Sequence, residues 1–423
     1  MFQEVFLTDS HAGPFDWVNS QLMGMTDRLR LSFMMFLNYV IWGAWYVTLG
    51  TYLTRTLKFS GTEAGLVFGT TALASMISPF FVGLIADRFF ATEKLLAVLH
   101  ILGAVVLYSV TKTTAFGPVY WLMLLYCLLY FPTIALTNSL ALQHIKEPGR
   151  DFPLIRVFGT LGWIAVGLVI GNMRVEESNV PFLIAAGASV AMAAFSLLLP
   201  HTPAPGKGKP ISARDILGID ALVMMKDPSF LVFAIASILA CIPLTFYFSF
   251  TNTYLNDVHV QNAAGKMTLG QGSEVFMMLL MPFIFRRISV KWVLLMGLAA
   301  WAIRYMLLAM GNATDGVWMF YAAILLHGVC YDFFFMTGQL YTDQQAPSHL
   351  RGAAQGLITF LTYGVGMFVG SLSSGRALDF FTKSAGVVDW KSFWTSSAIG
   401  AAVILLMIAV LFRTRAKVGT AAA

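Results

Sequence analysis

Twelve long apolar runs, separated by short polar stretches, follow one another along the 423-residue chain. A helix needs about 20 apolar residues to cross a bilayer, and these runs are of that order. Because backbone groups in lipid must be hydrogen-bonded within the protein, each run is predicted to be a helix. The predicted spans are 31–53, 66–85, 95–111, 119–139, 154–171, 181–199, 230–255, 270–285, 292–311, 317–340, 355–375 and 393–412. The pattern therefore predicts an all-α membrane protein with twelve transmembrane helices.

The composition agrees with this pattern and excludes several functional classes. The chain is 58% hydrophobic and 11% charged, whereas a soluble domain is about half apolar and about a quarter charged. Its mean hydropathy is +0.74. So little polar surface excludes a soluble enzyme, a nucleic-acid-binding module and a disordered chain. The three cysteines fall inside apolar runs, and their spacing predicts neither a disulfide framework nor a metal site: Cys127, Cys241 and Cys330.

One polar segment divides the chain into two parts of similar length. Residues 200–229 are rich in Pro, Gly and Lys, which is typical of a linker. They separate residues 31–199 from residues 230–412, and each part contains six predicted spans. We expect tails at residues 1–30, which do not have the features of a signal peptide, and at residues 413–423. Two six-helix bundles joined by a basic linker are typical of major facilitator transporters.

The distribution of Lys and Arg predicts the orientation of the chain. With the N-terminus in the cytoplasm, the cytoplasmic segments hold 17 of these residues and the outer segments hold eight. Cytoplasmic loops of membrane proteins carry such an excess. We therefore expect both termini in the cytoplasm, as well as a cytoplasmic linker. The net charge of +6 then reflects orientation rather than an acidic partner.

The loop after the second predicted span has the sequence Gly83-Leu-Ile-Ala-Asp87-Arg88. It resembles the G-x-x-x-D-R/K loop motif of major facilitator proteins. The resemblance implies that Asp87 pairs with neighbouring helix ends and that Arg88 stabilises the outward-open state. The alternative is a generic short cytoplasmic turn.

Ionisable residues inside spans cost about 2.5–3.5 kcal/mol each at the bilayer centre, and they usually face a protein interior or a water-filled cavity. Arg156 shares one helix face with Thr160 and Trp163, at positions i, i+4 and i+7. A cation, a hydroxyl and a flat ring on one face can hold a planar polar ligand by hydrogen bonding and stacking. The alternative is that Arg156 lies near the cytoplasmic end of its span and extends to the interface.

Glu274 lies in the eighth span, on the same face as Gln271. Together these side chains suit sugar hydroxyl groups, which both donate and accept hydrogen bonds. Because burial favours the neutral form of a carboxyl group, Glu274 is also a candidate proton carrier. The alternative is an exposed Glu274 near the outer surface.

The tenth and ninth spans contain the other two ionisable residues. Asp332 follows His327 and Tyr331, which lie one turn apart on a shared face. Asp332 either carries a proton or pairs with an arginine. We expect Arg304 to form a structural ion pair or to extend to the interface, because the ninth span lies at the periphery of this fold.

Six groups of residues on these spans form a pattern typical of one family. They are Trp42-Gly43-Ala-Trp45 with Thr48-Leu49-Gly50-Thr-Tyr52; Tyr130-Phe-Pro132-Thr133 with Asn138; Asp151-Phe152-Pro153-Leu-Ile155-Arg156-Val-Phe-Gly159-Thr160-Leu-Gly162; Gln271-Gly-Ser-Glu274; Tyr331-Asp332-Phe333-Phe334 with Gly338; and Arg351-Gly-Ala-Ala354-Gln355-Gly356. The chain thereby resembles the bacterial nucleoside–proton symporter family of the major facilitator superfamily, from about Leu31 to Phe412.

The resemblance implies proton-driven nucleoside uptake across the bacterial inner membrane. It implies protons as the coupling ion and no other cofactor, and we expect a monomer in the lipid bilayer. We expect no enzymatic activity, because the sequence has no H-E-x-x-H zinc motif and no nucleophile–base arrangement. The composition predicts no nucleic-acid partner. The residues implied in the site are Arg156 and Thr160 against the nucleoside, Trp163 stacked on it, Gln271 and Glu274 on the ribose, and His327 and Tyr331 lining the cavity, with Glu274 or Asp332 carrying the proton. His327 departs from the family pattern.

The seventh span departs further from the family pattern. The family's best-known nucleoside members have two amide side chains where this sequence aligns Thr245 and Phe248. Losing two amides removes hydrogen-bonding capacity from one side of the site. A proton symporter for another polar solute, such as a sugar or a modified nucleoside, is therefore the main alternative. A membrane receptor that binds without transporting is a weaker one, because the chain has no long soluble signalling segment.

Overall fold

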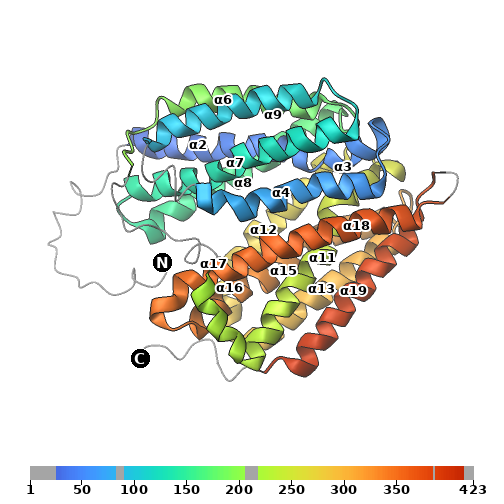
Figure 1. Ribbon diagram of the computed structural model, residues 1–423. Helices are drawn as coiled ribbons and strands as arrows, with labels where there is room; N and C mark the ends of the chain where they lie inside the picture. The colour runs from blue at the N-terminus through green and yellow to red at the C-terminus, as the bar shows by residue number, and fades with distance from the viewer. Residues whose placement is uncertain (1–24, 82–89, 205–217, 384–385, 414–423) are drawn as a thin grey trace.

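The protein is almost entirely helical in a computed structural model, which describes residues 25–81, 90–204, 218–383 and 386–413 (Figure 1). The first part comprises α2 (Met25–Tyr46), α3 (Leu49–Thr51), η1 (Tyr52–Thr56), α4 (Gly61–Phe81), α6 (Thr92–Val110), α7 (Phe116–His144), α8 (Pro148–Met173) and α9 (Val180–Ser196). The second part comprises η3 (Ile219–Lys226), α11 (Pro228–Asp257), α12 (Ala263–Phe285), α13 (Val290–Met310), α14 (Val317–Leu325), α15 (His327–Tyr331), η4 (Asp332–Met336), α16 (Thr337–Gln345), η5 (Ser348–Leu350), α17 (Arg351–Thr359), η6 (Phe360–Gly366), α18 (Met367–Phe381) and α19 (Trp390–Leu411).

Twelve helical passes run through the described residues. α2, α3 and η1 join into one pass, α14 to α16 into another, and η5 to α18 into a third. Ten of the passes are long and apolar enough to cross a membrane; the other two are α4 and the 17-residue α9. The predicted twelve-helix membrane fold is confirmed. The loop motif of Gly83, Asp87 and Arg88 lies outside the described residues and stays a prediction.

The passes form two bundles that pack against each other, the first drawn in blue to green and the second in yellow-green to red (Figure 1). In the first bundle α2 packs against α8 and α9, and α6 packs against α7 and α9. In the second, α11 packs against α18 and α19, and α13 against α19. The bundles meet where α4 lies against α18 and α8 against α12. Glycines permit the first contact, because a Cβ on Gly65 would lie 3.1 Å from the Gly375 Cα.

Local sequence signals account for several helix ends. Asp227 precedes α11 and its side chain accepts a hydrogen bond from the Phe230 N–H at 2.9 Å, with Pro228 at the first helical position. α8 ends at Arg174, whose left-handed backbone (φ 54°) stops the helix.

The last part of the predicted linker is structured. Residues 205–217 lie outside the described residues, but η3 precedes α11 directly. Ala221 and Met224 of η3 are buried, and the element packs against α11 and α17. These two apolar side chains are three residues apart, so they lie on one face of a 3₁₀ helix and can be buried together. The overall Pro, Gly and Lys content of the segment gives no sign of this buried face.

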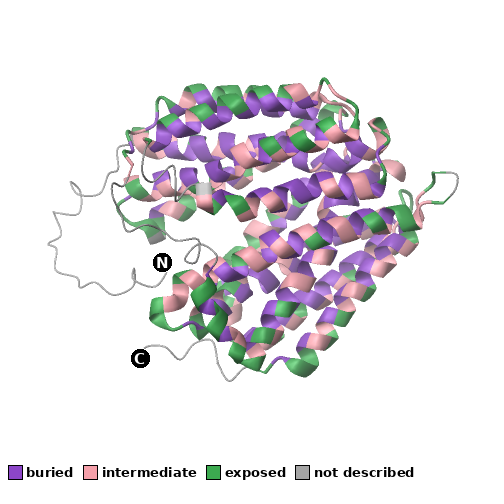
Figure 2. Ribbon diagram, in the orientation of Figure 1, coloured by how far each residue is buried: buried purple, intermediate pink, exposed green. Residues whose placement is uncertain are grey.

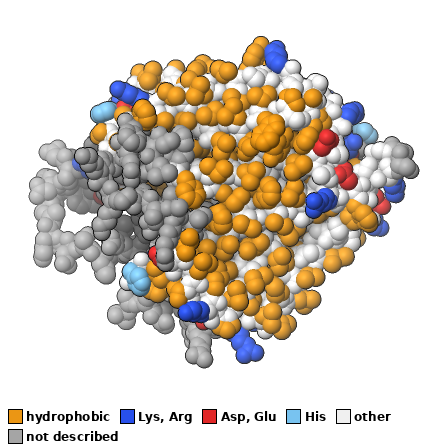
Figure 3. All heavy atoms as spheres, in the orientation of Figure 1, with side chains coloured by type: hydrophobic (Ala, Val, Ile, Leu, Met, Phe, Trp, Pro, Cys, Tyr) orange, Lys and Arg blue, Asp and Glu red, His pale blue; other side chains and the backbone are white. Residues whose placement is uncertain are grey.

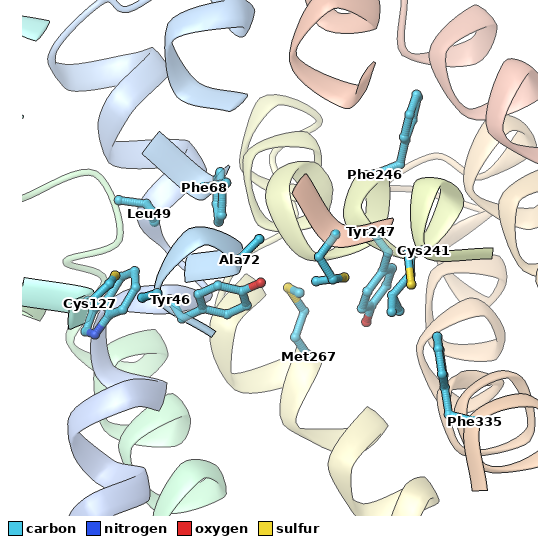
Figure 4. Packing of buried hydrophobic residues seen from close by; sticks show 14 of the residues in the cluster. Tyr46, Leu49, Phe68, Ala72, Cys127, Cys241, Phe246, Tyr247, Met267 and Phe335 are labelled. Atoms are coloured by element: carbon cyan, nitrogen blue, oxygen red, sulfur yellow. The ribbon is translucent and has the colours of Figure 1, made fainter. Parts of the chain in front are cut away.

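Burial follows the pattern that a membrane protein requires. Exposed residues lie mainly on the outer faces and at the ends of the helices (Figure 2). Hydrophobic side chains cover the middle of the face in Figure 3, and charged side chains gather mostly toward its two ends. Inside, one hydrophobic cluster extends across both bundles and includes Tyr46, Phe68, Tyr247 and Met267 (Figure 4). Because this interior is packed, a solute can bind between the bundles only where the packing leaves a cavity.

Candidate functional site

A cavity of about 220 Å³ lies between the two bundles. Eight of the nine residues predicted to bind substrate line it, and these come from α8, α11, α12 and α15. The lining residues are Tyr39, Trp42, Tyr46, Thr71, Ser75, Phe131, Arg156, Thr160, Trp163, Phe248, Gln271, Glu274, His327, Tyr331, Tyr363 and Met367. Residues more than 300 positions apart in the sequence thus surround one space.

α8 supplies a cationic wall. Arg156 Nη2 donates a hydrogen bond to the Tyr39 hydroxyl at 2.6 Å, and the guanidinium carbon lies 4.2 Å from the centre of the Tyr39 ring. Gly159 leaves room for this pair, because a Cβ there would lie 2.8 Å from Arg156 Nη1. Thr160 and Trp163 continue the same face into the cavity. Arg156 therefore lies at the cavity rather than at the membrane interface.

α12 supplies an acidic wall. The Glu274 side chain is 34% exposed and lines the cavity with Gln271. Its Oε2 lies 3.7 Å from His327 Nε2, which is beyond hydrogen-bonding distance. Within the described ranges we find no hydrogen bond to the Glu274 carboxylate. An open carboxylate can accept hydrogen bonds from a solute or take up a proton.

Aromatic rings form flat apolar walls between the two charged ones. The Trp42 and Trp163 rings lie 5.4 Å apart and meet edge to face at 78°. The Tyr46 and Phe248 rings, from opposite bundles, lie 6.0 Å apart at 62°. Such rings suit offset or edge-on contact with a planar solute.

Two π-helical segments flank the cavity on the second bundle. Tyr331 lies at the end of α15, directly before η4, and Tyr363 lies within η6. Their hydroxyl groups are hydrogen-bonded to each other. π-Helical turns shift side chains relative to a regular helix and are frequent at functional sites.

Two of the predicted site residues do not line the cavity. Thr245 is buried between α11 and α18, and its hydroxyl donates to the Ile242 carbonyl at 2.7 Å. Asp332 is 4% exposed, and its Oδ2 has no hydrogen-bond partner among the described residues. On α11, Phe248 is therefore the residue that reaches the cavity.

Arg304 differs from both expectations for it. The side chain is fully buried in α13, so it does not extend to the interface. In the described parts of the chain it forms no salt bridge, and its Nη1 instead lies 3.0 Å from His327 Nδ1. A histidine that lines the cavity thus takes the place of the expected carboxylate partner.

Comparison with known proteins assigns the chain to a family. The family described as nucleoside H⁺ symporter matches residues 25–417. The chain belongs to this family. The symporter is 42% identical to the protein YegT of Escherichia coli (strain K12), over 92% of the chain and 94% of YegT. It is 34% identical to the xanthosine permease of the same organism, over 91% of the chain and 95% of the permease.

A solved structure supports the same assignment. The crystal structure of the nucleoside transporter NupG matches with a TM-score of 0.86 and 28% identity, covering 92% of the symporter and all of NupG. The family resemblance and the major facilitator fold expected from the sequence are confirmed. The chain is a multi-pass membrane transporter of the nucleoside H⁺ symporter family.

At one end of the symporter, a buried carboxylate joins the two bundles. Glu176 follows α8 and is 4% exposed. Its Oε2 accepts hydrogen bonds from the side-chain amides of Asn252 (2.7 Å) and Asn256 (2.8 Å) on α11. Its Oε1 accepts from the backbone N–H of Ala264, in the first turn of α12, at 3.0 Å. A carboxylate at a helix N-terminus is favourably placed.

Further polar contacts between the bundles lie at the same end. Thr51 donates to the Asn252 side chain at 2.6 Å, and Arg55 forms a salt bridge with Asp257. Asp379 of α18 accepts hydrogen bonds from the first turn of α4, including the Thr62 N–H at 2.8 Å. Asn252 lies one turn beyond Phe248 on α11. Polar contacts therefore join the two bundles at this end of the molecule, which we call the closed end.

Sequence reasoning missed part of the lining of the symporter's cavity. Tyr39, Trp42 and Tyr46 line it from α2, and their spacing of three and four residues places them on one helix face. This aromatic stripe was the available signal. Thr71, Ser75 and Met367 carried none, because small polar residues and methionine are common throughout spans.

Proposed function

We propose that this protein imports a nucleoside together with a proton by alternating access, with the cavity between the bundles as the binding site. One observation carries the proposal: a cation, an open carboxylate, an amide and aromatic rings from both bundles line one cavity in a chain of the nucleoside H⁺ symporter family. A nucleoside combines a flat base with a hydroxyl-bearing sugar, and this lining suits both. The function is transport, without chemical change of the solute.

The lining suggests how the solute is held. Arg156 and Thr160 hydrogen-bond the base, and Trp163 provides a flat surface for it. Gln271 and Glu274 bind the sugar hydroxyls from the opposite wall. Phe248 closes the cavity toward the closed end. Because both bundles contact the solute, binding can draw them together.

Glu274 carries the coupling proton in this proposal. Its carboxylate lines the cavity and lacks a hydrogen bond from the described residues, so uptake of a proton breaks no contact. Asp332 is the second candidate, because it is buried with an unpartnered oxygen. Moving one charge through ~100 mV supplies about 2.3 kcal/mol. That corresponds to roughly 50-fold accumulation at one proton per nucleoside.

The proposal includes an orientation. We place both termini and the linker of residues 200–229 in the cytoplasm of a bacterial cell, on the Lys and Arg distribution. In this proposal the closed end faces outward, and the conformation is an inward-facing one. Residues 31–199 and 230–412 act as the two moving bundles of a monomer.

A proton symporter for another polar solute is the second candidate. The observation that favours it is that Phe248 is the α11 residue in the cavity, whereas Thr245 faces α18. That side of the cavity thus offers a ring and no amide. A solute with fewer hydrogen-bonding groups on that side would fit equally well.

Uptake into proteoliposomes tests the proposal. Radiolabelled uridine is offered with and without an inward proton gradient, with a protonophore and with protein-free liposomes as controls. We expect gradient-stimulated uptake that the protonophore abolishes. If folded protein takes up no uridine, competition and thermal-shift screens with purine nucleosides, xanthosine and sugars decide between the two candidates. Absence of coupling to any of them overturns the proposal.

A further inference from the structure

A buried cation stands directly behind the acidic wall of the cavity. The guanidinium carbon of Arg304 lies 3.3 Å from the centre of the Tyr247 ring, and Nη1 lies 3.0 Å from His327 Nδ1. Nε and Nη2 form no hydrogen bond with another described residue, although the Cys330 thiol and the Tyr247 hydroxyl lie close. A cation removed from water without a carboxylate partner is costly. Its placement therefore needs a reason beyond packing.

The contact with His327 fixes the chemistry of the imidazole. A guanidinium carries only hydrogen-bond donors, so His327 Nδ1 must be the acceptor. Nε2 of the neutral ring then carries the hydrogen atom. A charged imidazolium would place two cations in contact in a dry interior, which is unfavourable. Arg304 thus selects one tautomer of His327.

The rings around His327 fix its direction. Its ring is stacked on Tyr247 at 5.5 Å with an interplanar angle of 21° and meets Phe248 edge to face at 5.7 Å. In this position Nε2 points toward Glu274 Oε2 at 3.7 Å. His327 is 2% exposed, so it presents one edge to the cavity. That edge is an N–H donor aimed at an open carboxylate.

We propose that Arg304 is a positioning residue of the solute site, acting through His327. It holds the imidazole as the Nε2–H tautomer, so that a neutral donor faces Glu274 and the part of the solute that Glu274 binds. The inference rests on the proposed function for its ligand. Other titratable groups with electrostatic influence on Glu274 or its surroundings are Arg156, Tyr39, Tyr331, Asp332 and Tyr363.

The direct test is spectroscopic and needs no ligand. ¹⁵N-histidine labelling of the whole protein gives nitrogen shifts that distinguish the two neutral tautomers and the imidazolium, and the His327→Gln variant identifies the resonance. We expect the Nε2–H form in the native protein and a mixture in Arg304→Met. An Nδ1–H form or an imidazolium in the native protein would overturn the inference, whether or not uridine is the substrate.

The functional test is a set of matched variants, each first shown to be monodisperse by size exclusion. His327→Phe keeps an aromatic ring at this position but removes both nitrogens, and we expect uridine binding to weaken about tenfold. His327→Gln keeps an acceptor for Arg304 and a donor for Glu274, so its affinity should stay within roughly threefold of the native protein.

A double-mutant cycle separates positioning from packing. If Arg304 acts through His327, Arg304→Met weakens binding in the native background and has no further effect in His327→Phe. An equal effect of Arg304→Met in both backgrounds would mean that the residue only packs. Should Arg304→Met not fold, the comparison of His327→Gln with His327→Phe and the native tautomer decide the inference.

Discussion

Two glutamates of this symporter have opposite surroundings. Glu176 at the closed end is 4% exposed and accepts three hydrogen bonds, all from the other bundle. Glu274 in the cavity has a side chain that is 34% exposed, and its Oε2 lies 3.7 Å from His327 Nε2, beyond hydrogen-bonding distance. Both oxygens of the Glu176 carboxylate accept hydrogen bonds from the protein. The Glu274 carboxylate accepts none from the described residues.

A carboxylate can serve two purposes, depending on its hydrogen-bond partners. A carboxylate whose acceptors are satisfied by the opposite bundle stabilises the conformation in which those bundles touch. A carboxylate without protein donors gains most when a solute or a proton arrives. We therefore predict that Glu176 influences which state is populated and that Glu274 influences what is bound. Substitutions at the two positions should separate these effects.

The largest effect is expected for Glu274→Gln. The amide keeps the size and a hydrogen-bonding oxygen but cannot take up a proton. Gradient-driven accumulation of uridine should fall to the level of protein-free liposomes, while exchange of labelled for unlabelled uridine without a gradient persists. Wild-type accumulation in this variant would move the proton to Asp332, which Asp332→Asn would then reveal. Glu147→Gln, an exposed glutamate before α8, serves as the control.

Arg156→Ala should produce the next largest effect, on binding. Loss of a charge-assisted hydrogen bond to the solute costs about 1.5–3 kcal/mol, or roughly 10- to 100-fold in affinity. Isothermal titration with uridine measures it. Arg150→Ala is the matched control, because Arg150 lies on the same helix with a 62% exposed side chain. Equal affinities in the two variants would show that Arg156 does not contact the solute.

Glu176→Leu should shift the conformational equilibrium rather than the chemistry of binding. It removes three acceptor contacts between the bundles, and one or two kcal/mol already changes a two-state ratio several-fold. Spin labels on exposed Lys58 and Lys383, one on each bundle near the closed end, report the separation by electron paramagnetic resonance. We expect a longer distance to gain population in Glu176→Leu.

Two further variants sharpen that experiment. Glu176→Gln keeps one carbonyl acceptor and should shift the distances less than Glu176→Leu. Glu177→Leu changes the neighbouring glutamate, which is exposed, and should leave the distances unchanged. An unaltered distance distribution in Glu176→Leu would remove this residue from the closure of the outer end.

The same comparison explains what could be predicted from sequence. Glu274 was found because a charge inside an apolar span is costly and therefore conspicuous. Glu176 lies in a short polar loop, where a carboxylate is expected to be solvated. Its partners are 76 to 88 residues away, beyond any local pattern. The twelve spans follow from hydrophobicity alone, whereas contacts between bundles do not.

Arg304 shows that a residue can be recognised as unusual from sequence while its partner cannot. Its position in a span marked it as unusual, and the sequence pattern favoured an ion pair or a snorkelling side chain. The structure pairs it with His327. Side chains on α13 and α15 meet only through the packing of the second bundle, so their spacing in sequence carries no sign of the contact.

The smallest effect is expected for a third carboxylate, one that serves only its own bundle. Asp389 precedes α19, and a hydrogen bond from the Ser392 N–H holds the pKa of this carboxyl below its ordinary value of 3.8. A lowered pKa in the folded state contributes stability above that ordinary value, which is lost as pH falls through the folded pKa. Asp389→Ala should cost about 1 kcal/mol of unfolding free energy, measured by thermal unfolding at neutral pH. Asp389→Asn keeps an acceptor and should restore most of it, without the dependence on acid. Because the described hydrogen bonds of this cap lie within one bundle, neither variant should alter the distance between labels at Lys58 and exposed Ala313, a pair that avoids Lys383, the ion-pair partner of Asp389; a shift there would mean that stability alone moves the closed end, and the distinct role assigned to Glu176 would fail.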